Sequence, residues 1–132
     1  MTGPDDMAAL AQLAGLASSA AEARLAVLIR AAAELRVRLA ALDDARRTRA
    51  EELASVDAAL LAGADLRWHR WIEGRRSALN AELARTLTEI ARAQAALRKS
   101  FGQKLAAEAL AEQEHKDRRR LHDRRAARDQ LS

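Results

Sequence analysis

Apolar residues recur every three or four positions along the first half of the chain, with polar residues between them. This alternation is typical of a helix that buries one stripe in a heptad seam. It is clearest from residue 25 onward, where it is held for five repeats. The positions of the seam are Leu25, Leu28, Ala32, Leu35, Leu39, Leu42, Arg46, Arg49, Leu53, Val56 and Leu60. The pattern predicts one long helix over about residues 5–62.

A second apolar stripe follows residue 66 and predicts another long helix over about 66–128. Its positions are Ile72, Leu79, Leu83, Leu87, Ile90, Leu97, Phe101 and Leu105. Between the stripes, Gly63 can adopt the left-handed conformation that closes a helix, and Asp65 can cap the next one, so we expect a turn at 63–65. At the start, Thr2 or Asp5 is the expected cap, with Pro4 in the first turn.

Two stripes of matched length joined by a short turn can bury each other. We therefore predict an all-α fold in which residues 1–132 form a single antiparallel coiled-coil hairpin, a long rod. With the turn at Gly63, facing residues have numbers that add to about 132. This register places Leu53 opposite Leu79 and Leu42 opposite Ile90.

Two arginines, Arg46 and Arg49, occupy seam positions where apolar residues are expected. In one interpretation their stems lie along the interface and their guanidinium groups reach acids across or beside the seam. In the other they set the register or bind a partner, as polar seam residues do elsewhere. The register places Leu83 opposite Arg49, with Glu82 and Glu89 as acids within reach.

The composition fits long helices better than a globule. Of 132 residues, 34 are Ala, 32% are charged and one is Pro, while the absence of Cys excludes disulfides and thiolate metal sites. The formal charge is +4, but acids are interspersed among the basic residues. Neither a secretion signal nor an uncharged run long enough to span a membrane is present in this sequence. We expect a cytoplasmic protein.

Candidate catalytic chemistry is sparse. The sequence has no phosphate-binding glycine loop and no triad pattern. His115 follows Glu112 by three residues, the spacing of ligands in di-iron bundles, but such a site needs a second pair and two further glutamates. A solvated histidine is the simpler interpretation of His115 and of His69. We expect no enzyme activity, no metal and no cofactor.

The best functional signal is a pair of tryptophans, Trp68 and Trp71, surrounded by arginines near the predicted turn. Such a pair either plugs the end of the seam or forms a protein-binding hot spot, and both interpretations stay open. A basic tail, Lys116 to Arg128, is a solvated helix end, a surface for an acidic protein or a nucleic-acid contact. Interleaved Asp residues and the lack of aromatic residues make nucleic acid the least favoured of the three.

The chain resembles the FliJ family of flagellar export stalk proteins and their type III secretion counterparts. The resemblance covers the whole length and rests on architecture and spacing. Its suggestive residues are Trp68, Trp71, Ile72, Arg75, Arg76, Leu79, Asn80, Leu83, Leu97, Phe101 and Gly102.

This resemblance implies a non-enzymatic partner of an export ATPase, located in the cytoplasm and peripheral at the inner membrane. The paired helix termini would enter the ATPase ring, and the region near the turn would face the membrane export gate; export chaperones are further candidate partners. Carried over, the gate-facing residues are Trp68, Trp71, Ile72 and Arg75. The ring-facing residues are Arg118, Arg119, Arg120, Arg124 and Arg125. The alternatives are a generic coiled-coil adaptor and a small basic nucleic-acid-associated protein.

Overall fold

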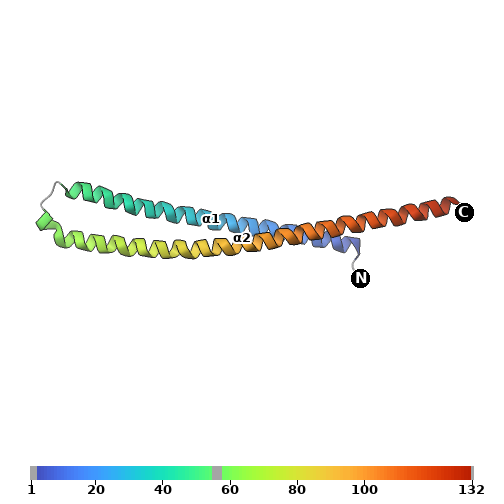
Figure 1. Ribbon diagram of the computed structural model, residues 1–132, viewed down its shortest axis with the longest axis horizontal. Helices are drawn as coiled ribbons and strands as arrows, with labels where there is room; N and C mark the ends of the chain where they lie inside the picture. Colours follow the sequence, from blue (N-terminus) through green and yellow to red (C-terminus); the bar gives the residue numbers. More distant parts are fainter. Residues whose placement is uncertain (1–2, 55–57, 132) are drawn as a thin grey trace. The chain divides into compact units, whose positions relative to one another are not determined.

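The computed structural model describes residues 3–54 and 58–131, and these residues form two helices (Figure 1). Helix α1 spans Pro4–Leu53 and helix α2 spans Ala58–Leu131. Ion pairs join Asp43 to Arg76 and Arg46 to Glu73, which shows that the helices run in opposite directions and pack against each other. The predicted all-α helical hairpin is confirmed.

Helix α1 begins with a reciprocal cap between Gly3 and Asp6. The backbone N–H of Gly3 donates to Oδ2 of Asp6 at 3.0 Å, and the N–H of Asp6 donates to the carbonyl of Gly3 at 3.0 Å. These bonds satisfy amides that every helix start leaves without partners. Pro4 stands in the first turn as expected, whereas Asp5 lies inside the helix and is not the cap. Thr2 lies outside the described residues.

The predicted turn at 63–65 is wrong, since α1 ends at Leu53 and α2 already begins at Ala58. Gly63 and Asp65 therefore lie within α2, and no described glycine has a positive φ. A single Gly costs a helix only about 1 kcal/mol relative to Ala. Good helix formers surround Gly63 in the sequence, so the helix continues through it. The predicted boundaries at residues 62 and 66 move accordingly.

The register of the two helices differs from the predicted one for the same reason. Two interhelical ion pairs, Asp43 with Arg76 and Arg46 with Glu73, join residues whose numbers add to 119 instead of about 132, and a third, Arg49 with Asp65, adds to 114. The difference is close to two heptads, so the same seam faces still meet. Leu53 consequently does not face Leu79, and Arg49 does not face Leu83.

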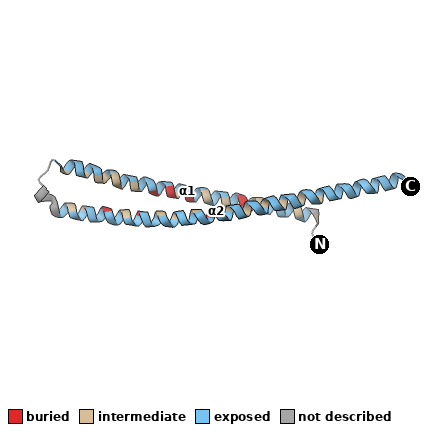
Figure 2. Cartoon of the chain, in the orientation of Figure 1, coloured by how far each residue is buried: buried red, intermediate tan, exposed pale blue. Residues whose placement is uncertain are grey.

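The hairpin divides into two compact units. The central unit contains residues Ala26–Arg92, and the terminal unit contains Met1–Leu25 with Ala93–Ser132. In the central unit the seam buries large apolar side chains (Figure 2). The buried residues are Leu28, Ala32, Leu35, Ile72 and Leu79. The predicted seam of α1 is confirmed from Leu25 to Leu53, because every one of its positions is buried or half-buried. Val56 and the Leu60 side chain lie outside the described part.

Small side chains form most of the seam in the terminal unit. Its buried or half-buried positions at heptad spacing are Met7, Ala11, Ala14, Ser18, Ala21 and Leu25 on α1, and Ala93, Leu97, Ser100, Lys104, Ala107, Ala111 and Glu114 on α2. Phe101 and Leu105, which the sequence placed in the seam, are about half exposed, and so is Leu87 in the central unit. Each of these three side chains comes one position after a half-buried seam residue, so it flanks the seam without filling it.

Candidate protein-interaction site

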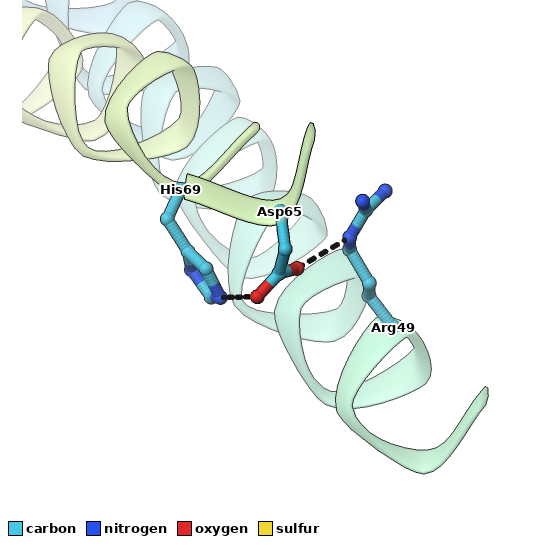
Figure 3. Close-up of polar contacts among 3 residues, drawn as sticks. All are labelled: Arg49, Asp65 and His69. Carbon is cyan, nitrogen blue, oxygen red and sulfur yellow. Dashed lines mark hydrogen bonds and ion pairs between the residues drawn. The ribbon is translucent and has the colours of Figure 1, made fainter. Parts of the chain in front are cut away.

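A polar segment, formed by Arg49 of α1 and by Asp65 and His69 of α2, interrupts the apolar seam of the central unit close to the start of α2. Arg49 is 28% exposed, and its Nε donates to Oδ1 of Asp65 at 3.0 Å (Figure 3). Oδ2 of the same carboxylate lies 3.4 Å from Nε2 of His69, one helical turn along α2. Asp65, predicted as a helix cap, instead pairs with two side chains. One of them comes from α1, so this carboxylate ties the two helices together.

The second seam arginine, Arg46, lies 3.1 Å from Glu73 across the seam. The prediction that the seam arginines reach acids across or beside the interface is therefore confirmed, although the acids are Asp65 and Glu73 and not Glu82 or Glu89. Such pairs are half solvated here and contribute little to stability, about 0.2–1 kcal/mol each. Their larger effect is on register, because a displaced helix would leave these charges without partners.

The Trp68 side chain belongs to this polar segment. Its ring lies 4.4 Å from the guanidinium carbon of Arg49, and its centroid is 5.3 Å from that of His69 in an edge-on arrangement. The residue is half-buried. A cation over an indole ring at this distance is attracted by about 0.5–1 kcal/mol at a partly solvated site. Trp68 therefore packs as part of the seam, which corresponds to the plug interpretation.

Trp71 lies differently, about 100° around α2 from the buried Ile72, and it is 61% exposed. Its neighbour one turn on, Gly74, has open space where a side chain would begin. Arg75 is also exposed. A large apolar ring beside small and cationic residues has the composition of a binding hot spot. Of the two tryptophans, Trp71 is the one available to a partner.

Ile72 is only 1% exposed and is among the most buried side chains of the central unit. The prediction that Ile72 faces a partner is therefore wrong. The heptad explains this, since the residue next to Trp71 in sequence points about 100° away around the helix and into the seam. Of the four residues expected to face the export gate, Trp71 and Arg75 are the exposed ones.

The arginines of the tail lie on the last part of α2, in the terminal unit. All five predicted residues, Arg118, Arg119, Arg120, Arg124 and Arg125, are exposed and helical. Every described residue of α2 after Glu114 is exposed as well (Figure 2). The tail is accordingly an ordered helix with accessible charges on its surface.

The histidine near the tail has surroundings unlike those of a metal ligand. Glu112, three residues before His115, lies 4.0 Å from Nζ of Lys116. Among the described residues, no group of three or more His, Cys, Asp or Glu side chains is arranged to hold a metal ion. In the described ranges, neither helix has a segment long and apolar enough to cross a bilayer.

Comparison of this chain with known proteins identified no similar protein. The chain matches no protein-family model, no curated protein and no solved structure. The candidate site therefore stands on its own geometry. The sequence identified the region through the tryptophans, but it missed the contribution of Asp65. The Asp65 to His69 spacing of four residues, next to a seam arginine, is the signal that marks it.

Proposed function

We propose that this chain is a non-enzymatic coiled-coil component of a flagellar or type III protein export apparatus, acting as a stalk. In this role it binds the export ATPase ring and couples it to the membrane export gate from the cytoplasmic side. The observation that carries a protein-binding role is Trp71, an indole ring exposed to solvent about 100° around α2 from the buried Ile72. The assignment to an export apparatus is supported by the resemblance to the FliJ family.

The division of contacts follows from which residues are accessible. Trp71 and Arg75 form the contact with the export gate, with the indole entering an apolar pocket and the guanidinium pairing with an acid at its rim. Trp68 and Ile72 pack in the seam, and this packing fixes the position of the segment of α2 that carries Trp71 and Arg75. The exposed tail arginines, Arg118 to Arg125, contact the ATPase ring.

The test is binding of the purified chain to an export ATPase and to the cytoplasmic domain of an export gate protein. We expect co-purification with the ATPase, stimulation of its hydrolysis, and binding to the gate that weakens about tenfold or more in Trp71→Ala. Val37→Ala is the matched control, since Val37 is 68% exposed in the same unit and removing it should leave gate binding unchanged. Absence of binding to both proteins at low salt would overturn the proposal.

A generic coiled-coil adaptor is the second candidate, and one observation favours it. Helix α1 exposes three leucines in the terminal unit, Leu10 at 49%, Leu13 at 62% and Leu16 at 68%. Spaced three residues apart, they form a stripe that a further helix can cover. Sedimentation across a range of concentrations separates the candidates, because an adaptor that assembles through this stripe dissociates on dilution, whereas a stalk hairpin remains monomeric.

A further inference from the structure

The net charge of the chain is confined to its last 18 residues. Residues 1–114 carry 16 basic and 16 acidic side chains, so the formal +4 charge of the protein belongs to the segment from His115 onward. Within that segment seven basic residues accompany Asp117, Asp123 and Asp129. The excess is therefore local and lies on a helix whose described residues are all exposed.

The basic residues of this segment continue the seam of the hairpin. Positions 104, 107, 111 and 114 are the last half-buried seam residues of α2. The same spacing of three and four residues leads on to Arg118, Leu121, Arg125 and Arg128. None of the three aspartates occupies one of these positions. The seam face of α2 thus changes from a mixture of Lys104, Ala107, Ala111 and Glu114 to three arginines with one central leucine.

The described residues of helix α1, which begins at Pro4, do not reach this part of the seam face. A surface hollow in the terminal unit is lined by Gly15 and Ser19 of α1 and by Lys104 of α2, which is consistent with facing residues whose numbers add to about 119. In this register Pro4, the first residue of α1, lies opposite about residue 115. The burial of α2 agrees, because Glu114 is the last residue that is not exposed. Figure 1 shows the end of α2 extending past the start of α1.

We propose that the face formed by Arg118, Leu121, Arg125 and Arg128, here called the arginine seam, binds an acidic helix of a partner protein. The partner helix takes over the position that α1 occupies up to Glu114, and its carboxylates pair with the arginines. This inference deepens the proposed function by naming the chemistry of the partner at the ring-facing arginines.

Three features favour an acidic helix over other occupants. The arginine seam is continuous with an interface already built for a helix, and Leu121 supplies an apolar contact that a phosphate backbone does not use. Guanidinium groups pair with carboxylates in a bidentate geometry, which gives direction as well as attraction. A second copy of the same segment is excluded, because two strongly basic faces repel each other.

The experiment uses the full chain and a synthetic probe, a fluorescent 21-residue helical peptide with Glu at the a positions and Leu at the d positions of its heptads. We expect saturable binding by anisotropy that weakens with salt, and no binding of a peptide with Gln in place of Glu. Duplex DNA and anionic vesicles are tested in parallel. Stronger binding to DNA or vesicles than to the peptide overturns the proposal.

Two variants with the same change in charge decide whether peptide binding depends on the arginine seam or only on the total charge of the tail. Arg118→Glu/Arg125→Glu alters the arginine seam, whereas Arg119→Glu/Arg120→Glu alters arginines that point away from it on the same helix. We expect the first to lose about tenfold or more in peptide affinity and the second about threefold or less. Circular dichroism checks that both remain helical. Equal losses would show diffuse attraction and overturn the proposal.

The two proposals, acidic-helix binding at the arginine seam and the export role, can fail independently of each other. Peptide binding through the arginine seam without any export ATPase binding supports this inference and rejects the export role. Export ATPase binding that is unaffected by Arg118→Glu/Arg125→Glu supports the export role and rejects the arginine seam.

Discussion

The two units of the hairpin follow the same heptad pattern but fill it with different side chains. The central unit buries Leu28, Leu35, Ile72 and Leu79, and it adds ion pairs across the seam such as Arg46 with Glu73. In the terminal unit the seam consists mainly of Ala and Ser. There, Ser18 and Ala93 are the only described residues that are buried, at 2% and 9% exposure.

This difference between the units shows that heptad periodicity alone does not determine how much a seam contributes to the stability of the folded chain. Burial of apolar area contributes about 25 cal/mol per Å², so a leucine or isoleucine contributes far more than an alanine at an equivalent position. Small residues let two helices approach closely, yet they remove little surface from water. We therefore expect the central unit to resist local opening more strongly than the terminal unit.

The largest effect is expected from truncation of Ile72, the most buried large side chain of the central unit. Ile72→Ala should lower the free energy of unfolding by about 2–5 kcal/mol, through lost apolar burial and the cavity left behind. Urea denaturation followed by circular dichroism measures it. Trp71→Ala, at the exposed neighbour, should cost less than about 1 kcal/mol. If Ile72→Ala does not fold, Ile72→Val should cost about 0.5–1.5 kcal/mol. Equal costs at positions 71 and 72 would contradict the assigned seam.

In the terminal unit, replacement of Ser18 is expected to raise the free energy of unfolding instead of lowering it. This residue is 2% exposed, and its hydroxyl has no hydrogen-bond partner. Ser18→Ala removes an unsatisfied polar group and a residue of lower helix propensity, so it should stabilise the protein by about 1 kcal/mol. Thermal or urea denaturation provides the measurement, with the exposed Ser19→Ala as a control of about 0.3–0.5 kcal/mol from propensity alone. A destabilised Ser18→Ala would mean that the hydroxyl is paired.

Substitution of Gly63 tests whether α2 passes through the predicted turn. Because Gly63 is helical and nothing lies within 4 Å of an added Cβ, Gly63→Ala should stabilise the hairpin by about 0.5–1 kcal/mol. Gly74→Ala, in the same helix with the same open surroundings, should give a similar gain. A left-handed turn at this position would instead make Gly63→Ala destabilising, so the sign of the change in urea denaturation decides between the two.

The smallest effect is expected in the polar segment of the central unit. A double-mutant cycle with Arg49→Met and Trp68→Leu should give a coupling of about 0.5–1 kcal/mol, the size of a cation over an indole ring at a partly exposed site. Pairing Arg49→Met with Trp71→Leu is the matched control, and its coupling should be near zero. Coupling of equal size in both cycles would contradict the different roles of the two tryptophans.

Much of the fold follows from local pattern. The seam of α1 from Leu25 to Leu53 lies where the sequence places it, and the seam arginines pair with acids as expected. The turn was misplaced because Gly63 carries a strong helix-stop signal, while its helix-forming neighbours outweigh the cost of one glycine. The candidate site was located by its tryptophans. Trp68 lies four residues before Ile72, so heptad spacing places it on the seam side, whereas the contact of its ring with Arg49 depends on the register of the two helices.

By itself, the sequence determined that the chain forms long helices with one apolar seam each, because helix periodicity is a local property of the spacing of side chains. Only the tertiary structure decided the register. A heptad seam matches equally well when one helix slides by whole heptads, so pairs between distant residues, such as Arg46 with Glu73, must make the choice. From that choice follow the pairing of Arg49 with Asp65 and the length of α2 that lies beyond the described start of α1.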